Sequence, residues 1–220
     1  MTQTLSSERH VIPAREARSE IKVVNSRFIA TAAPAFTADE AKAFIARVKS
    51  EFSDATHNVP AYVIGHGNSI IAHCHDDGEP SGTAGRPALA VLRGSGLGDV
   101  AVVVTRYFGG TKLGTGGLVR AYGDAVRRVL ACLPRALKVA THTVVVTMPY
   151  SYFERAQRLV AAHDGQVIAQ AFAVEVTLTV RFAVERLPAF QGALREMSNG
   201  ALQADIIETN PATIFPIAAE

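Results

Sequence analysis

An acidic turn holds the first residues whose types and spacing could support chemistry. The segment that begins DDGEPSGTAG carries Asp76, Asp77 and Glu79, directly after His73 and His75. Two histidines two positions apart on a strand share a face, so with these carboxylates they could ligate a metal ion. The carboxylates could also perform acid–base catalysis. Because the run DGEP is also typical of an ordinary tight turn, we assign no metal ligand, no cofactor and no catalytic residue.

A glycine-rich segment, Gly109–Gly117, is the second candidate. It follows an apolar run and precedes a helical pattern, and backbone N–H groups at such a helix start bind anions. Its sequence, GGTKLGTGG, is neither a Walker A loop nor a Rossmann fingerprint. Lys112 and Arg120 would add positive charge for a phosphate or a carboxylate. A small anion bound at this loop is one hypothesis, and close packing of strand on helix, which glycine also permits, is the other.

Four further side chains have nucleophilic atoms, but their sequence contexts do not predict catalysis. Ser81 lies in PSG rather than in GxSxG, and no Ser–His–Asp order can be read from the spacing. Thr83 belongs to the same turn. Cys74 and Cys132 lie far apart without CxxC spacing, which argues against a zinc ribbon or a disulfide framework and fits a reducing cytosol.

The charge distribution points to the first half of the chain for an anionic partner. Of the 220 residues, 48% are hydrophobic and 19% are charged, which predicts a folded core. The net charge of +2 does not by itself indicate a nucleic-acid or membrane binder. Between Arg106 and Arg135, however, six basic residues accompany only one acid, Asp124. These charges either attract an anion or form a solvated helix face.

No segment of the sequence indicates a membrane or secreted protein. No apolar stretch approaches the roughly 18 residues that suggest a membrane-spanning helix. The segment Met1–His10 is polar and lacks the apolar run of a secretion signal. We therefore expect a cytoplasmic protein with no membrane partner.

The elements that position these residues are predicted from hydrophobic spacing. An uninterrupted apolar run, Val100–Thr105, is typical of a central strand covered on both faces. A helix is expected over Gly117–Leu133, on which Arg120 and Asp124 are four residues apart and able to pair. The other expected elements of this half are a strand at Ile21–Ala33, a helix capped by Thr37 and Glu40, a hairpin of Ala61–Ile64 with Ser69–His73, and a short helix at Pro87–Leu92.

The second half shows the order strand, helix, strand, strand, helix, strand, which is the split ferredoxin-like order. In one of these strands Val176, Leu178 and Val180 alternate with polar residues, so one face is expected to be buried and the other wet. We place the boundary near residue 136. The fold class is therefore α+β, with residues 1–136 as one domain and residues 137–220 as a ferredoxin-like βαββαβ sandwich.

Two long strings carry a resemblance to a known family. DDGEPSGTAGRP (Asp76–Pro87) and VVVTRYFGGTKLGTGGLVRAY (Val102–Tyr122) resemble the hallmark of the YigZ/Impact family, which comprises bacterial YigZ-type proteins and the C-terminal part of eukaryotic Impact. The resemblance implies that the first domain is a β-sheet backed by helices, similar to a domain of a small-subunit ribosomal protein and of translocase GTPases. The second would resemble the ferredoxin-like last domain of those translocases. The turn near Phe172 departs from the family pattern, because it lacks a glycine.

The resemblance also implies a role, since Impact proteins are regulators that act through protein contacts in translational control under stress. It favours a non-enzymatic binding protein whose partner is RNA, the ribosome or a translation-regulating protein. The alternative is a hydrolase or phosphoryl-handling enzyme that uses the acidic turn and the glycine-rich loop as one site. A purely structural role for both motifs is the third hypothesis. The candidate binding surface consists of Asp76, Asp77, Glu79, Ser81, Thr83, Arg106, Tyr107, Phe108, Gly109, Gly110, Lys112, Gly114, Gly116, Gly117 and Arg120.

Overall fold

The computed structural model describes residues 9–67 and 69–216. The chain divides into two compact units, formed mainly by His10–Leu137 and by Lys138–Phe215. Each unit packs helices on an antiparallel sheet, so the α+β fold class expected from the sequence is confirmed. None of the helices described is long and apolar enough to cross a membrane.

The first unit is built on a five-stranded antiparallel sheet with β6 at its centre. The strands are β2 (Ala17–Val23), β3 (Ser26–Pro34), β4 (His57–Ile64), β5 (Ile71–Cys74) and β6 (Val100–Tyr107). Their order in the sheet is β2-β3-β6-β4-β5. Every residue of β6 except Tyr107 is buried, which confirms the central strand predicted from its apolar run.

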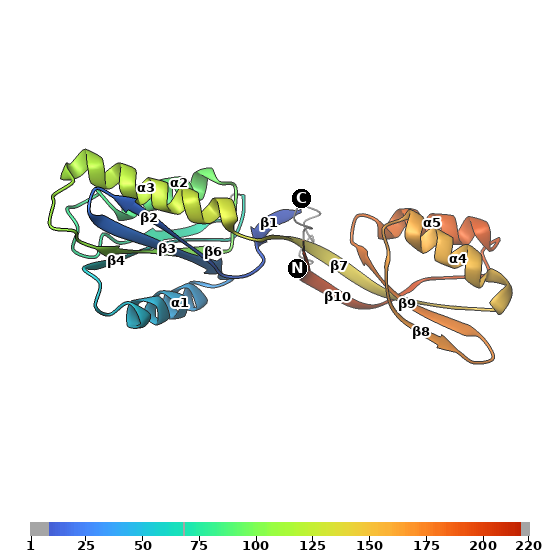
Figure 1. The fold of residues 1–220 in the computed structure, drawn as a ribbon. Helices are drawn as coiled ribbons and strands as arrows, with labels where there is room; N and C mark the ends of the chain where they lie inside the picture. Colours follow the sequence, from blue (N-terminus) through green and yellow to red (C-terminus); the bar gives the residue numbers. More distant parts are fainter. Residues whose placement is uncertain (1–8, 68, 217–220) are drawn as a thin grey trace. The chain divides into compact units, whose positions relative to one another are not determined.

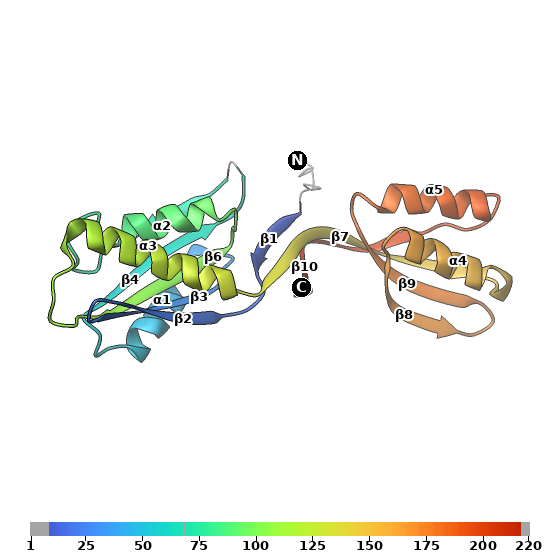
Figure 2. The same ribbon diagram turned by 45° about the horizontal axis from the view of Figure 1, so that its top comes forward.

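Helices cover both faces of this sheet. α2 (Gly85–Gly94) and α3 (Gly114–Cys132) lie side by side on one face, and α1 (Ala38–Glu51) lies on the other (Figures 1 and 2). Because successive strand residues point to opposite faces, Val102 and Val104 pack beneath α2 and α3, whereas Val103 packs against α1. The glycine-rich segment is thus the link from the central strand to α3.

The single strand expected at Ile21–Ala33 is wrong in detail, because the chain reverses within it. β2 and β3 form a hairpin that turns at Val24 and Asn25. Val24 has φ 54, a left-handed conformation that β-branched residues rarely adopt. A valine at this position resembles strand sequence, which is why the pattern concealed the turn.

The start of α1 confirms the predicted cap by Thr37, while the return bond of Glu40 reaches one residue before the N-cap. The hydroxyl of Thr37 accepts a hydrogen bond from the Glu40 backbone N–H at 3.1 Å. The Glu40 carboxylate in turn accepts one from the Phe36 N–H at 2.8 Å. Local side-chain–backbone bonds of this kind are readable from sequence because both partners lie within one turn.

The second unit has the βαββαβ order that the sequence predicted. Its elements are β7 (Arg135–Met148), α4 (Tyr150–Ala162), β8 (Gln166–Phe172), β9 (Val176–Ala183), α5 (Leu187–Met197) and β10 (Asp205–Pro216). The sheet runs β10-β7-β9-β8, with β1 (His10–Pro13) also paired to β7. At the glycine-free turn between β8 and β9, the Ala173 N–H donates to the Glu175 carbonyl at 3.0 Å.

Candidate functional site

Glu79 lies at the centre of a buried polar network. Its side chain is only 3% exposed. One carboxylate oxygen accepts hydrogen bonds from Arg106 Nη1 at 2.6 Å and from the Tyr122 hydroxyl at 2.8 Å. The same oxygen lies 3.8 Å from His57 Nε2. Since Arg106 ends β6, Tyr122 belongs to α3 and His57 begins β4, one carboxylate ties the acidic turn to three elements.

Arg106 is held as firmly as its partner. Its guanidinium lies over the rings of Phe28 and Phe108, at 5.4 Å and 5.5 Å from the two centroids. Nη2 donates to the Ser26 hydroxyl at 3.3 Å, while the buried Nε has no hydrogen-bond partner among the described residues. Burial, reinforced by the Glu79 carboxylate, raises the pKa of Tyr122, so the phenol stays neutral and donates.

Asp76 organises the entry to α2. Its carboxylate accepts three backbone N–H bonds, from Gly82 at 2.8 Å, Gly85 at 2.8 Å and Ala84 at 3.1 Å. The N-cap residue of α2, Ala84, has no side-chain oxygen, so Asp76 satisfies these N–H groups from outside the helix. Partial burial alone would raise the pKa of Asp76, but the three N–H donors outweigh it and hold the pKa below its ordinary value.

Asp77 joins the turn to α1 and β4. Its carboxylate accepts from Lys49 Nζ at 2.5 Å and from the Asn58 N–H at 2.7 Å. Its carbonyl accepts from His57 Nδ1 at 2.8 Å, and its N–H donates to His75 Nδ1 at 2.9 Å. Burial would raise the pKa of Asp77, yet Lys49 and the Asn58 N–H lower it overall.

The remaining polar residues of the turn divide between buried and exposed. Thr83 is buried and its hydroxyl donates to the Pro80 carbonyl at 2.6 Å, whereas Ser81 is exposed. The cysteines Cys74 and Cys132 are both free thiols. Within the described ranges, no three His, Cys, Asp or Glu side chains are grouped so that they could hold a metal ion.

The glycines after β6 fall into different classes. A Cβ on Gly109 would lie 2.0 Å from the Asn25 carbonyl oxygen, so this glycine lets the chain pass the β2–β3 turn. Gly110 and Gly114 have φ of 82 and 71, and a Cβ added at Gly117 would lie 3.0 Å from Leu113 Cβ. These four glycines have structural reasons.

Gly116 differs from its neighbours. A Cβ there would meet nothing within 4 Å, and its φ lies outside the left-handed region. A glycine inside a helix loses about 1 kcal/mol of stability relative to alanine. Neither packing nor backbone conformation requires a glycine at position 116. Because Gly116 has no side chain, the backbone at the start of α3 is uncovered there.

The start of α3 is exposed and positively charged. Its N-cap residue, Leu113, makes no side-chain cap. Lys112 and Arg120 are exposed, and in the part of the chain described no hydrogen bond or ion pair engages either. Phe108 is 45% exposed. We refer to Phe108, Lys112, Gly116 and Arg120 together as the loop–helix surface.

The predicted pairing of Arg120 with Asp124 is wrong. Asp124 instead accepts from Arg127, at 2.8 Å to Nη2 and 3.3 Å to Nε. Residues three apart on a helix are neighbours as much as residues four apart, and the two-pronged contact of Arg127 takes the carboxylate. Arg120 is thereby left as an unpaired cation beside the glycine-rich segment.

The structure brings together one part of the sequence-derived surface and not another. Glu79 and Arg106 meet directly, and Tyr107 nearby donates to Asp54 at 2.8 Å. Among the described residues no hydrogen bond or ion pair joins Lys112 or Arg120 to an acid of the turn. The carboxylates serve internal contacts, and the cations face solvent.

Sequence reasoning did not include Tyr122 or Lys49 among the candidates, although both contact the acidic turn. Tyr122 lies in the apolar stripe of α3 and is fully buried. A buried tyrosine hydroxyl normally requires a partner, so its presence in that stripe was the available signal. For Lys49 there was none, because an exposed-face lysine on a helix is ordinary.

The fold and this network define a class: a two-domain α+β protein with a helix-covered N-terminal sheet and a ferredoxin-like C-terminal domain. Residues 24–130 match the Impact N-terminal domain, and residues 146–201 match a domain of unknown function, DUF1949. The chain is 37% identical over 202 residues to the IMPACT family member YigZ of Escherichia coli, covering 91% of this chain and 99% of the relative. The chain belongs to the IMPACT family.

Other relatives agree with this assignment. An IMPACT family member of Haemophilus influenzae is 34% identical over 90% of this chain and 97% of its own length. YvyE of Bacillus subtilis is 54% identical over 107 residues, 49% of each chain. A crystal structure described as a hypothetical protein is 37% identical, with a TM-score of 0.61 over 91% of this chain and 98% of that one.

Proposed function

We propose that this chain is a non-enzymatic binding protein that contacts RNA, free or within the ribosome, through the loop–helix surface. The observation that carries the proposal is the division of charges around the glycine-rich segment. The carboxylates of the acidic turn, Asp76, Asp77 and Glu79, accept internal hydrogen bonds. Lys112 and Arg120 are exposed and unpaired in the described structure. Because Lys49 and Arg106 neutralise Asp77 and Glu79, the two unpaired cations outweigh the remaining charge of Asp76 at this edge.

The positive charge extends along both helices of this face. The segments 85–94 and 112–135 contain seven basic residues and a single acid, Asp124, which is paired with Arg127. The basic residues are Arg86, Arg93, Lys112, Arg120, Arg127, Arg128 and Arg135. A phosphate backbone is attracted by such a face largely independently of base sequence. Its contacts would be salt-dependent.

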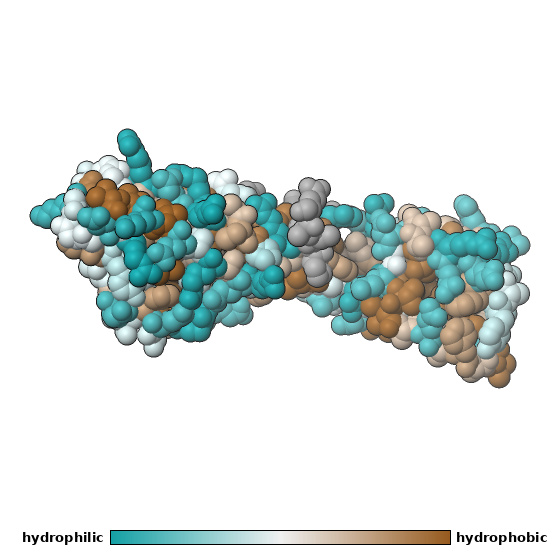
Figure 3. Space-filling view, in the orientation of Figure 1, coloured by the Kyte–Doolittle hydropathy of each residue, from teal (hydrophilic) through white to brown (hydrophobic). Residues whose placement is uncertain are grey.

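Two further features of the loop–helix surface suit RNA. The exposed ring of Phe108 is a platform on which an unpaired base can stack, as aromatic side chains do in single-strand binders. The bare backbone at Gly116 leaves the first N–H groups of α3 open to a phosphate oxygen. Apolar patches lie among hydrophilic side chains on the surface over α3 (Figure 3). Such a mixed surface suits a ligand that has both stacking bases and phosphates.

The enzymatic alternative needs a carboxylate that is free to act beside Lys112 and Arg120. Glu79 already accepts two hydrogen bonds in a buried site, and Asp76 accepts three backbone N–H groups. A general base must reach the proton it removes. These commitments favour binding over hydrolysis or phosphoryl transfer.

Family membership supports the choice of partner. A relative named Protein IMPACT in Xenopus laevis is 37% identical over 93 residues, 40% of this chain and 29% of that protein. The resemblance to regulators of translation favours a partner in translation, either ribosomal RNA or a regulatory protein, and the charges of the loop–helix surface favour RNA. Such a role places the protein in the cytoplasm. A translation-regulating protein would be sought by pull-down if RNA binding fails.

The test is a comparison of two double variants that each remove two positive charges. K112A/R120A changes the loop–helix surface, and K22A/K42A changes residues on β2 and α1, away from it. At low salt, we expect K112A/R120A to weaken binding to a labelled single-stranded ribosomal RNA fragment about tenfold and to lower the log–log salt slope by about 1.4. K22A/K42A is expected to retain affinity. Equal losses in both variants, or no binding at low salt, would refute the RNA proposal.

A further inference from the structure

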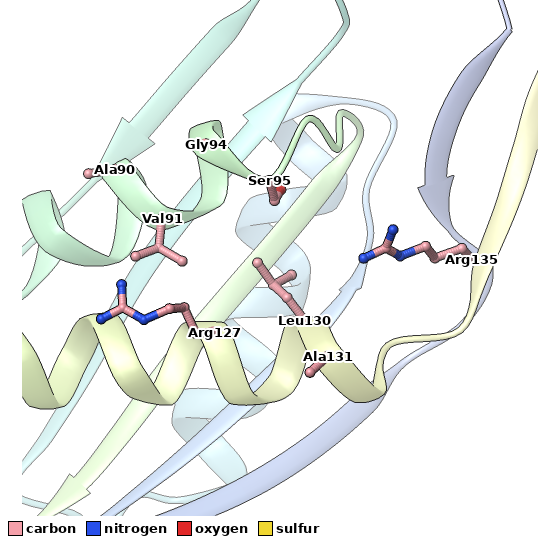
Figure 4. Close-up of a pocket in the computed structure, with 8 residues that line it drawn as sticks. All are labelled: Ala90, Val91, Gly94, Ser95, Arg127, Leu130, Ala131 and Arg135. Atoms are coloured by element: carbon pink, nitrogen blue, oxygen red, sulfur yellow. The ribbon is translucent and has the colours of Figure 1, made fainter.

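A pocket opens between α2 and α3 at the end far from the glycine-rich segment. Its volume is about 600 Å³, and its walls come from the last turns of both helices and from Arg135 at the start of β7. Val91, Leu130 and Ala131 supply apolar surface (Figure 4). A volume of this size lies within the range of small-molecule sites, about 300–1,000 Å³.

Small residues create the hollow. Ala90 and Gly94 on α2 and Ala131 on α3 line it, and none extends beyond a methyl group. A Cβ added at Gly94 would meet nothing within 4 Å, so no neighbour fills that space. Leu130, 6% exposed, forms part of a rigid wall that belongs to the main core. The space is thus built from packed helices rather than from a loop.

Two arginines supply the charge of the pocket. Figure 4 shows the Arg127 side chain extending toward Val91 and the Arg135 side chain extending toward Leu130. Arg127 is oriented by Asp124, which binds Nε and Nη2 and leaves Nη1 without a bond in the described structure. Arg135 makes no hydrogen bond or ion pair with any residue described. Both guanidiniums retain donors for a ligand.

The other polar side chain of the lining is already committed. The Ser95 hydroxyl donates to the Leu92 carbonyl at 2.6 Å and accepts from the Leu97 N–H at 3.2 Å. Polar recognition in this pocket therefore comes from guanidinium groups, which prefer carboxylate, phosphate and sulfonate oxygens and can bind them with two parallel hydrogen bonds.

We propose that this pocket binds a small amphiphilic anion, with an apolar body against Val91, Leu130 and Ala131 and an acidic group on Arg135. The site is distinct from the loop–helix surface, since Arg127 follows Arg120, the last member of that surface, by seven residues, about 10 Å of helix rise. The pocket would thus give the α2–α3 face a small-molecule site in addition to its proposed contacts with RNA phosphates.

The experiment uses two fluorescent probes that share an apolar body. Anilinonaphthalene sulfonate carries an anionic group, and phenylnaphthylamine is its neutral counterpart. We expect the full chain to bind one sulfonate probe, at least about tenfold more tightly than the neutral probe, because only the sulfonate engages Arg135. R135A is expected to weaken the sulfonate probe about tenfold and to leave the neutral probe unchanged.

Two further variants separate charge from shape. A131F fills the hollow from an exposed helix position and is expected to weaken both probes at least about tenfold. R128A removes an equal charge from α3 outside the pocket lining and is expected to change neither. Thermal unfolding of each variant checks that the fold is kept.

The proposal would be overturned by the absence of sulfonate binding, by binding that is unaffected by both R135A and A131F, or by equal losses with R128A and R135A. The outcome is independent of the RNA proposal, because K112A/R120A should leave the sulfonate probe unaffected while it weakens RNA. Loss of probe binding in K112A/R120A would place the probe on the loop–helix surface and refute the pocket site.

Discussion

Glu79 shows how a single buried carboxylate can stabilise a fold by joining several elements through one oxygen. It is buried with Arg106, and each is the other's only ion-pair partner of opposite permanent charge in the described structure. A buried charge without its partner is strongly destabilising, whereas removal of both charges is often tolerated. The stability of the first unit is therefore expected to depend on the pair more than on either member.

E79A is expected to lower the free energy of unfolding by about 3–5 kcal/mol, because it leaves the Arg106 guanidinium buried and uncompensated. R106A should have a similar effect by stranding Glu79. The double variant E79A/R106A is expected to lose less free energy of unfolding than the sum of the two single losses, because it leaves no buried charge unpaired. Urea denaturation measures all three, and strictly additive losses would contradict the coupling.

Asp76 makes a different prediction, because its hydrogen bonds depend on ionisation. Its pKa is held below the ordinary value in the folded chain, so the stability it contributes is present above the unfolded pKa, about 3.9, and is lost as pH falls through the folded value. D76N is expected to lower the free energy of unfolding by about 1–3 kcal/mol at pH 7. The difference from the wild type should shrink below about pH 4.

Thermal unfolding between pH 7 and pH 2 measures this convergence. S81A provides a matched change in the same turn, because Ser81 is exposed, and its small effect should be independent of pH. A difference between D76N and wild type that stays constant down to pH 2 would show that the backbone N–H bonds do not depend on the charge of Asp76.

At the scale of elements, α3 has two roles: its buried stripe packs in the core, and its exposed start is the proposed RNA contact. A substitution at Gly116 can separate the effect on stability from the effect on RNA affinity. G116A is expected to raise the free energy of unfolding by about 0.5–1 kcal/mol, because alanine favours the helix and a Cβ there meets no atom. The same methyl group is expected to lower RNA affinity, because it covers backbone that a phosphate approaches.

G192A is the matched control, because Gly192 lies inside α5 and a Cβ there also meets nothing within 4 Å. It should stabilise the chain by a similar amount without changing RNA affinity. If G116A stabilises the protein and binds RNA as well as the wild type, the helix start is not the contact site, although the cations of the surface could still be.

The elements also show which features of the fold were accessible from sequence. The capping box at Thr37 and the central strand at Val100–Thr105 depend on residues close together in the chain, and both were predicted. The turn at Val24 was missed, because its left-handed backbone is imposed by the sheet on a residue that favours strands. Features that depend on neighbouring residues can be predicted from sequence, whereas a backbone conformation imposed by the sheet cannot.

The candidate site separates along the same line. The dense turn and glycine patterns indicated which residues to consider as a candidate site, but not that Arg120 is unpaired, because Asp124 was expected to be able to pair with it. The fate of the acids was not predictable, because Glu79 finds partners 27 and 43 residues away, at Arg106 and Tyr122. Spacing along the chain says little about contacts at that distance, so carboxylates that appeared available for chemistry proved to be internal ligands.

At the scale of the whole molecule, each unit has a hydrophobic core of its own. The first unit has apolar clusters on both faces of its sheet, and the second has one cluster beneath α4 and α5. Units of this size, with independent cores, commonly fold alone. A fragment of residues 10–137 is therefore expected to unfold cooperatively, and so is a fragment of residues 138–216.

The same fragments locate the binding function. Since the loop–helix surface and its supporting network lie within residues 10–137, that fragment should bind RNA with the affinity and salt slope of the full chain, and residues 138–216 should not bind. Each fragment must also be folded for this comparison to hold. Circular dichroism and RNA titrations measure both properties. A folded first fragment with much weaker affinity would mean that the second unit supplies part of the RNA contact, and the surface would then have to be extended beyond the glycine-rich segment.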